Sequence, residues 1–243
     1  LNKSAQEKRD ELFPKKKFGF KSKQNMTSLA SAIETANDTR RLVGGGGEKH
    51  VDDDDGRLVL TSSTALQNTC TLRDLNGVRK SLTSADIDDK DILIVNVSDS
   101  FIQLPGKASC IQIKYAKNCT ILCGPVSGST FVANCVDCRL VIACHQLRIH
   151  ESQRVSFYIH VGSRAIIEYS SEVHFAPYAW TFDGVEACFR RAGFDRAQIG
   201  WQSIDDFNWL VSDQQSPNWS YLDEKKRVKW ITNESGETSE SIN

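Results

Sequence analysis

The sequence predicts a mainly β protein whose central part is a parallel β-helix, a coil in which each turn pairs with the turns before and after it. Three observations lead to this prediction. From Leu58 to about Phe182 the chain is rich in Val, Ile, Leu, Thr, Phe and Cys, in short runs without helical periodicity. These runs recur about every 18 residues. The repeats also lack the two-residue Asn-Gly or Asp-Gly turns that join antiparallel strands in a sandwich.

The repeat is one strand pair with its corners. The later strand of each pair begins at spacings of 18, 19, 17 and 18 residues, at Phe101, Cys119, Cys138, Val155 and Val173. An earlier strand precedes each of them, over residues 92–97, 111–115, 131–135, 147–150 and 166–169. At about 3.3 Å per residue, one repeat traces a closed path of roughly 60 Å, which suits one turn of a coil. A unit this short cannot fold alone, so we expect successive turns to stack and to share one core.

The chain on either side of the repeats has a different composition. Residues 1–57 combine a basic run from Lys15 to Lys23, the glycines Gly44 to Gly47 and the aspartates Asp52 to Asp55, which together are typical of a flexible linker. The predicted organisation is a disordered linker over residues 1–57, a β-helix domain over 58–180, a C-terminal extension packed on it over 181–231, and a disordered polar tail over 232–243.

The extension is predicted to begin with a helix over residues 183–192. Val185, Phe189 and Ala192 have the spacing of one apolar helix face, Asp183 is a candidate N-cap and Gly193 is a stop signal. Most of the tryptophans follow this helix, at Trp201, Trp209, Trp219 and Trp230. We expect these aromatic residues to cover the unpaired edge of the last turn of the coil.

Composition excludes several classes of function. Lys and Arg total 30 against 31 for Asp and Glu, so the net charge of −1 excludes the strongly basic surface of a nucleic-acid binder. The longest apolar stretches, such as residues 92–97, are far too short to span a bilayer, and no signal sequence opens the chain. We therefore expect a cytoplasmic protein without a nucleic-acid or membrane partner.

The eight cysteines are expected to be reduced thiols packed in the core of the coil. Cys119 and Cys138 occupy equivalent positions in adjacent turns and should stack. Cys135 and Cys138 form the only close pair, whereas a structural zinc site normally shows two such pairs or matching histidines. The histidines of the coil have no ligand spacing, so we expect no metal.

The coil itself shows no pattern of an active site. Its acidic residues occupy unrelated repeat positions, whereas a polysaccharide enzyme of this architecture would stack them on one face; they are Asp99, Asp137, Glu151, Glu168 and Glu172. The chain also has no Ser-His-Asp order and no nucleophile elbow. The residues by themselves therefore predict a binding module.

Five segments, in this order along the chain, resemble the tubulin-binding cofactor C family. They are Cys144–His150, Ile166–Ser171, Phe175–Trp180, Asp205–Leu210 and Ser216–Ser220. The likeness extends from about residue 70 to residue 231, and the basic-aromatic run from Lys15 to Lys21 resembles the linker before the family's domain. That domain is a right-handed β-helix, so the resemblance implies this handedness for the coil.

The resemblance implies a role in tubulin folding. In this family a Gln-x-Arg motif supplies an arginine finger to a bound GTPase, and the motif here is Gln146 and Arg148. The client would be β-tubulin held with cofactors D and E, and GTP hydrolysis would release native αβ-tubulin in the cytoplasm, in association with the cytoskeleton. GTP and Mg would be bound by the partner, so we expect no cofactor in this chain and a GTPase activator without a complete active site. Partner contacts are implied at Glu168, Asp206 and Phe207.

The chemistry of arginine suits this implied role. Gln146, Arg148 and His150 alternate along a predicted strand, so they share one face. A planar, permanently charged guanidinium stabilises negative charge on a transferring phosphoryl group better than an ammonium does. The competing structural interpretation is a surface arginine that pairs with Glu151 or Glu168.

Two other functions stay open at this point. A related branch of the family, that of the retinitis pigmentosa protein, shares the Gln-x-Arg pair and activates an Arf-like small GTPase, although its acylation signal and extra C-terminal domain are not visible here. A non-catalytic β-helix scaffold, as in actin-cyclase-associated proteins, is distinguished by the presence of Arg148. The family also implies an N-terminal three-helix domain, and we expect the segment from Leu1 to Phe13 to be the end of its last helix.

Overall fold

The computed structural model describes residues 68–195, 197, 200–211 and 213–242. The predicted linker, residues 1–57, lies outside this part of the chain, as do residues 58–67 at the start of the predicted β-helix domain.

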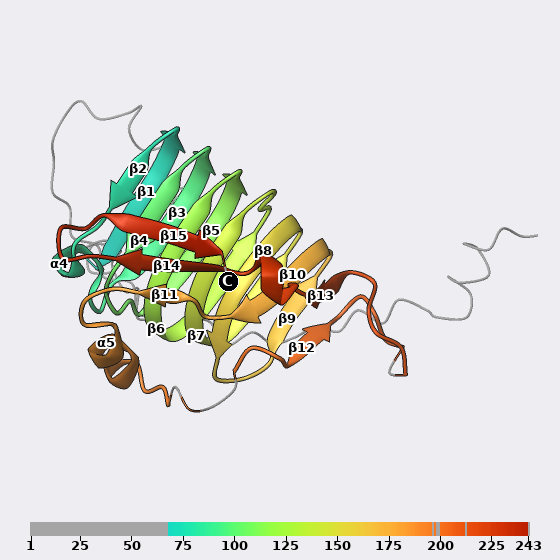
Figure 1. Ribbon diagram of the computed structural model, residues 1–243. Helices are drawn as coiled ribbons and strands as arrows, with labels where there is room; N and C mark the ends of the chain where they lie inside the picture. Colours follow the sequence, from blue (N-terminus) through green and yellow to red (C-terminus); the bar gives the residue numbers. More distant parts are fainter. Residues whose placement is uncertain (1–67, 196, 198–199, 212, 243) are drawn as a thin grey trace, which may run out of the picture. The chain divides into compact units, whose positions relative to one another are not determined.

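Twelve short strands form a parallel coil of about six turns, which confirms the predicted fold class (Figure 1). The strands are β1 Thr69–Asn76, β2 Arg79–Ser81, β3 Asp91–Ser98, β4 Phe101–Leu104, β5 Cys110–Lys117, β6 Thr120–Ala133, β7 Arg139–His150, β8 Gln153–Val161, β9 Ala165–Glu168, β10 Ser171–Pro177, β12 Ile204–Asp206 and β13 Trp219–Tyr221. A short helix, α4 Ser84–Ile87, lies between β2 and β3.

The strands pair in two stacks. The open stack consists of β1, β3, β5, the second halves of β6 and β7, β9 and β12. The covered stack consists of β2, β4, the first halves of β6 and β7, β8, β10 and β13. In the covered stack Phe101 pairs with Thr120, whereas the repeat predicts that it pairs with Cys119, so the predicted register is wrong by one residue at this turn.

The core of the coil is built from inward-facing side chains that lie directly above one another. In the open stack one such ladder runs through Ile94, Ile113, Val132, Ile149 and Ile167, which are all fully buried. Full burial of each branched side chain contributes about 1.5–3 kcal/mol relative to exposure. Every turn therefore depends on its neighbours, and the stack is a rigid support for whatever its outer face carries.

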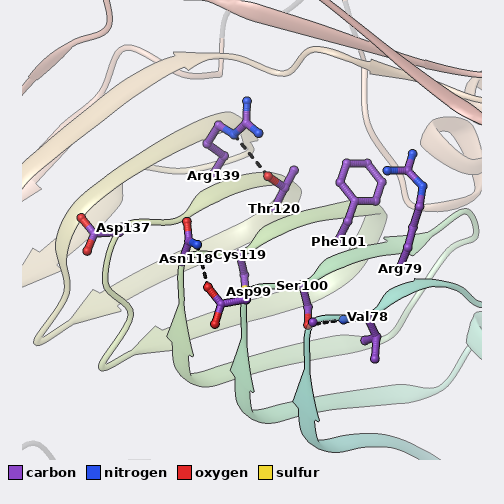
Figure 2. A pocket seen from close by; sticks show the side chains of 11 residues that line it. Val78, Arg79, Asp99, Ser100, Phe101, Asn118, Cys119, Thr120, Asp137 and Arg139 are labelled. Carbon is purple, nitrogen blue, oxygen red and sulfur yellow. Dashed lines mark hydrogen bonds between the residues drawn. The ribbon is translucent and has the colours of Figure 1, made fainter.

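The corners between the two stacks explain the positions of the turn acids. Asp99, Asn118, Asp137, Arg154 and Glu172 occupy one corner position on successive turns, each with a positive φ of 50–55°. Asn and Asp tolerate this left-handed conformation better than most residues. The prediction that these acids occupy unrelated positions is therefore wrong for three of them, which the backbone geometry of the corner brings into one column. Figure 2 shows Asp99, Asn118 and Asp137 on successive turns.

Six of the eight cysteines are buried and all eight are free thiols, as the sequence predicts. Cys119 and Cys138 lie at equivalent positions on adjacent turns, and their thiols donate to the carbonyl oxygens of Lys117 and Val136, each at 3.2 Å. Burial raises the pKa of the thiols of Cys135 and Cys144 to about 12. These side chains are therefore neutral and act as small apolar groups of the core.

The C-terminal extension covers one face of the coil. Its elements are β11 Trp180–Thr181, α5 Val185–Arg191, the short 3-10 helix η2 Glu224–Lys226, β14 Val228–Thr232 and β15 Thr238–Ile242. Trp180, Phe189 and Trp230 pack with Tyr158 in a second apolar cluster over the outer face of the covered stack. Figure 1 shows β11, α5, β14 and β15 lying along this side of the strands. No described element packs in this way over the open stack.

Three details of the extension differ from the prediction. Residues 232–243 were predicted to be a disordered tail, but β15 pairs antiparallel with β14, and Thr238 donates to Gln103 at 2.6 Å. A polar segment held by backbone pairing has no hydrophobic signal, so composition could not reveal it. The N-cap of α5 is Gly184, with φ 77°, and not Asp183, although Gly193 ends the helix as predicted. The tryptophan-rich segment also supplies β12 and β13 to the last turn of the coil.

Among the described residues, no helix has the length and apolar character needed to cross a membrane.

Candidate functional site

Arg148 lies in the second half of β7, on the outer face of the open stack. It stands between Phe131 of the preceding turn and Ile166 of the following turn, and the same register continues to Asp205 in β12. Its side chain is 50% exposed, and one Nη donates to Glu168 Oε2 at 3.1 Å. The guanidinium is therefore accessible to a partner while a carboxylate limits its orientation.

Gln146 and His150 share the face of Arg148, as their alternation in the sequence predicts. Gln146 is exposed and His150 is half-buried, whereas the intervening Leu147 and Ile149 are buried in the core. The His150 ring meets Tyr169 edge-on, with the ring centroids 5.4 Å apart. An amide, a guanidinium and an imidazole thus follow one another along the outer face of the strand.

Glu168 is in β9, opposite His150 and diagonal to Arg148. The predicted ion pair with Arg148 is therefore present, whereas Glu151, the other predicted partner, lies 3.6 Å from His150 Nδ1. Since Arg148 remains half exposed within this pair, the contact is compatible with binding a partner.

Asp206 and Phe207 have different environments, although they are neighbours. Asp206 Oδ2 accepts hydrogen bonds from Ser216 Oγ at 2.6 Å and Asn218 Nδ2 at 2.7 Å, so its carboxylate is occupied within the chain. Phe207 is 46% exposed, and its N–H donates to Ile167 O at 3.0 Å. In this geometry Asp206 organises the loop and Phe207 is the side chain that is available to a partner.

Arg164 and Asp205 belong to the same face, and the sequence reasoning did not select them. Arg164 Nε donates to Asp205 Oδ2 at 2.6 Å and an Nη donates to Oδ1 at 2.5 Å, a two-point contact between residues 41 positions apart. No local pattern in the sequence links these two residues, because they meet only when β12 pairs with β9.

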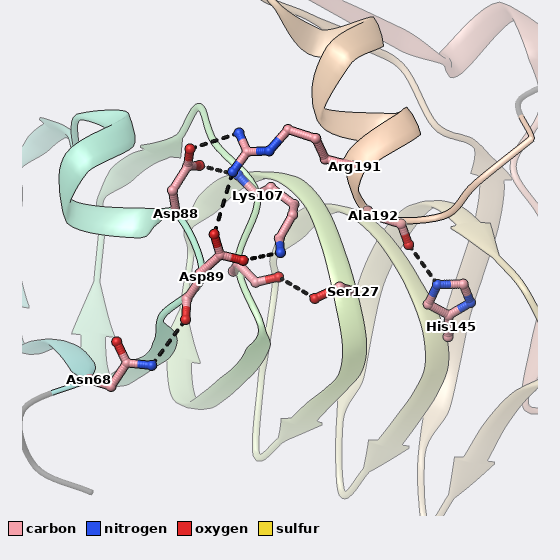
Figure 3. Close-up of polar contacts among 9 residues, drawn as sticks. Asn68, Asp88, Asp89, Lys107, Ser127, His145, Arg191 and Ala192 are labelled. Atoms are coloured by element: carbon pink, nitrogen blue, oxygen red, sulfur yellow. Dashed lines mark hydrogen bonds and ion pairs between the residues drawn. The ribbon is translucent and has the colours of Figure 1, made fainter. Parts of the chain in front are cut away.

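His145 connects the strand that carries Gln146 and Arg148 to the extension. Its Nε2 lies 2.8 Å from the carbonyl oxygen of Ala192 at the end of α5, and its ring stacks on Phe194 at 4.3 Å. The same helix is held at Arg191, whose Nη1 donates to Asp88 at 2.8 Å (Figure 3). These contacts attach α5 both to the corner before β3 and to β7.

A hollow of about 380 Å³ lies on the covered stack, beside the corner column (Figure 2). Arg79 lies over the ring of Phe101, with its guanidinium carbon 4.0 Å from the centroid, and Arg139 donates to Thr120 at 3.2 Å and pairs with Glu240. Both arginines of the lining are thus engaged within the chain. Among the described residues, no three His, Cys, Asp or Glu side chains are grouped as metal ligands.

Residues 89–207 match the family model described as Tubulin binding cofactor C. Gln146, Arg148, Glu168, Asp206 and Phe207 all lie within this match. Residues 89–207 thus carry the domain of the tubulin-binding cofactor C family. Within this domain the five residues lie on β7, on β9, and at the end of β12 or directly after it.

Relatives of the cofactor C domain are found in animals and plants. Tubulin-specific chaperone C of Bos taurus is 32% identical over 239 residues, which cover 95% of this chain and 65% of that protein. Tubulin-folding cofactor C of Arabidopsis thaliana is 40% identical over 131 residues, 54% of this chain and 38% of that protein. A solved structure, Tubulin Binding Cofactor C from Leishmania major, aligns with 48% of this chain and 80% of its own at 28% identity, with a TM-score of 0.44. The chain spans about 65% of the length of the first of these relatives.

Proposed function

We propose that this chain is a tubulin-folding cofactor that stimulates GTP hydrolysis by β-tubulin and inserts Arg148 as an arginine finger. The observation that carries the proposal is the placement of Arg148, half exposed on the face of a paired sheet beside Gln146. The family match and the names of the relatives, a tubulin-specific chaperone and a tubulin-folding cofactor, support tubulin as the client. In the complete process, cofactors D and E hold tubulin, and hydrolysis releases native αβ-tubulin in the cytoplasm, at the cytoskeleton.

The chemistry needs only one charge from this chain. During phosphoryl transfer, negative charge spreads over the oxygens of the transferred group, and a guanidinium that reaches them stabilises the transition state. Tubulin supplies GTP, Mg²⁺ and the attacking water, while Arg148 supplies the cation. A finger provided in this way is worth about 10³–10⁵ in rate, or roughly 4–7 kcal/mol of the barrier.

The neighbours of Arg148 prepare it for this role. Glu168 holds the guanidinium at 3.1 Å, so the side chain is oriented before the partner arrives. Gln146 lies two residues before Arg148 on the same face and projects an amide that can donate to a phosphate oxygen or to the attacking water. The buried residues Leu147 and Ile149 fix the strand beneath both.

The test is single-turnover GTP hydrolysis by tubulin in the presence of cofactors D and E. Arg148→Ala should reduce the stimulated rate by at least 10³-fold, to the unstimulated level. Arg148→Lys should recover little of it, because an ammonium lacks the planar fork of donors. Both variants should unfold at the temperature of the parent protein, since the side chain is half exposed. A variant that stimulates as well as the parent would refute the finger.

The same assay separates the two competing functions. An Arf-like GTPase in place of tubulin tests the second kind of client, and we expect no stimulation of it. A scaffold without catalytic effect would stimulate neither GTPase while still binding its partner.

A further inference from the structure

An exposed apolar patch continues the face of Arg148 at the last turn of the coil. We define this terminal patch as Tyr169, Phe207, Leu210 and Val211, whose exposed fractions are 70%, 46%, 87% and 42%. They are half of the large hydrophobic side chains that are exposed on the described part of the chain. Their concentration at one end of one face distinguishes the patch from hydrophobic residues scattered singly over the surface.

The loop that presents the patch is tightly held. Trp209 N–H donates to Asp206 O at 3.1 Å, and Trp209 Nε1 donates to Gln214 O at 3.0 Å. Tyr169 N–H donates to the side chain of Asn208 at 2.5 Å, which ties the corner after β9 to the same loop. These bonds fix Asn208 and Trp209, which directly precede Leu210.

A hollow lies next to these side chains. It has a volume of about 360 Å³, and its apolar lining comes from Ile204, Phe207, Trp209, Val211 and Trp219. The surface thus has a protruding apolar side chain, Leu210, beside a partly apolar hollow. Such a surface suits an apolar segment of a folded protein, because both features are desolvated when a matching surface closes over them.

The position of the patch relative to Arg148 identifies its occupant. Arg148, Ile166 and Asp205 are adjacent in register on β7, β9 and β12, so about 10 Å separates the first and the last of them at 4.8 Å per strand. Phe207 follows two residues after Asp205, directly beyond the end of β12. A standard interface covers about 800 Å² on each partner, a surface roughly 30 Å across. The terminal patch therefore lies within the reach of an interface centred on Arg148.

Charge also favours a neutral, apolar contact at this site. Two ion pairs lie beside the patch, Arg148 with Glu168 and Arg164 with Asp205. Neither pair leaves an excess charge that would select an acidic or basic ligand, so the patch itself supplies the binding energy.

We propose that the terminal patch is the docking surface for the same tubulin subunit that receives Arg148, and that it binds an apolar segment of that subunit. The inference rests on the proposed function for the identity of the partner. On this face the patch provides affinity and places the partner, whereas Arg148 acts on the transferred phosphate.

The experiment compares Leu210→Asp with the matched control Ile242→Asp, which changes a 70% exposed isoleucine in β15 on the extension. Binding to purified αβ-tubulin carrying a non-hydrolysable GTP analogue is measured directly, and stimulation is measured with cofactors D and E. Leu210→Asp should raise the Kd for tubulin at least 10-fold and raise the half-maximal concentration for stimulation equally, with the maximal rate within twofold of the parent. Ile242→Asp should bind as the parent does.

Arg148→Ala should have the opposite effect: the maximal stimulated rate is lost, while the Kd for tubulin stays within threefold of the parent value. The two measurements therefore distinguish a failure of the arginine-finger proposal from a failure of the docking proposal. The milder Leu210→Ser replaces Leu210→Asp if the latter unfolds. The docking proposal is overturned by parental binding in the Leu210 variant, by equal weakening in the Ile242 control, or by a parent protein that does not bind tubulin. A parent dimer that Leu210→Asp dissociates would also overturn it, since a second copy of this chain would then be the occupant.

Discussion

Arg148 and Glu168 form an ion pair whose strength matters for the proposed chemistry. The arginine is half exposed, and such surface pairs contribute only about 0–1 kcal/mol. A finger on a transferring phosphoryl group is worth roughly 4–7 kcal/mol. Glu168 can therefore orient Arg148 in the free protein and release it when a phosphate approaches. A fully buried pair could not do so, because breaking one costs about 3–5 kcal/mol.

Gly124 is a residue on which the coil depends sterically. An ideal Cβ at this position would lie 2.1 Å from the carbonyl oxygen of Gly106, which is backbone of the preceding turn and cannot move aside freely. Gly124→Ala should lower the free energy of unfolding by about 3 kcal/mol or more. Gly77→Ala is the matched control, because its Cβ meets nothing within 4 Å and only its φ of 64° is unfavourable, at about 1–2 kcal/mol.

Urea unfolding of the two glycine variants gives both values on one scale. Equal losses of stability in Gly124→Ala and Gly77→Ala would contradict the steric argument.

The residues of the candidate site divide by the kind of signal they leave in the sequence. A strand points successive side chains to opposite faces, so residues two apart share a face. This alternation alone predicts the shared face of Gln146, Arg148 and His150. Arg164 and Asp205 were missed, since 41 residues separate them and only the pairing of β9 with β12 brings them together. The role of Asp206 was also hidden, as its hydrogen-bond partners Ser216 and Asn218 lie in a later loop.

At the scale of elements, α5 is the connection between the extension and the strand of the finger. The helix has only seven residues, too few to be stable alone, so its position depends on tertiary contacts. Two of these contacts are the ion pair of Arg191 with Asp88 and the approach of His145 Nε2 to Ala192 O (Figure 3).

His145→Ala removes both the polar contact to Ala192 and the stacking on Phe194. We expect the free energy of unfolding to fall by about 1–2 kcal/mol. Hydrogen exchange should accelerate in α5 and in the strand residues beside position 145. The comparison is His174→Ala, which loses a hydrogen bond of 2.9 Å to Ser220 in another part of the coil. Unchanged exchange in α5 for the His145 variant would show that this contact does not hold the helix.

β15 shows why amino-acid composition can fail to predict a strand. The strand has one large apolar residue, Ile242, and its side chains are mostly exposed. It is held by antiparallel pairing with β14 and by polar bonds such as Thr238 to Gln103, 135 residues away. Backbone pairing is available to any sequence, so a polar segment beside a free strand edge can become ordered without a hydrophobic pattern.

At the scale of the molecule, carboxylates that join turns and corners determine the response to acid. Hydrogen bonds from Lys107 and Arg154 lower the pKa values of Asp89 and Asp137 below 3.8, and Thr83 lowers the pKa of Asp86 in the same direction. A lowered folded-state pKa contributes stability that is present above the unfolded value and is lost as pH falls through the folded value. Burial raises the pKa of Asp91, which has the opposite effect.

The unfolding free energy should therefore decrease as pH falls below about 3.8, since three carboxylates act in that direction against one. Urea unfolding at pH 5, 4 and 3 measures this dependence. Asp137→Asn should reduce the loss between pH 4 and 3, because it removes one titrating group whose partner is Arg154. Stability that rises on acidification over this range would contradict the assignment.

The coil and its extension are asymmetric, and this asymmetry distinguishes the face proposed to bind a partner. Both stacks present strands that alternate inward and outward residues, yet only the covered stack receives the aromatic cluster of the extension. Leu122, Val141 and Tyr158 face outward there and are buried by Trp180, Trp230 and α5. The equivalent positions of the open stack carry Arg148, which is exposed, and Phe131 and Ile166, which are half-buried.

The repeat, the parallel coil, the burial of most cysteines and the shared face of Gln146, Arg148 and His150 could be predicted from the sequence. All of these follow from local periodicity, in which a strand alternates its side chains and a turn has a nearly constant length. Long-range contacts, in contrast, fix which face is covered, which charges pair, how Asp206 is used and where Leu210 projects. Those features depend on contacts between residues from about 10 to more than 100 positions apart, and no short-range pattern encodes such contacts.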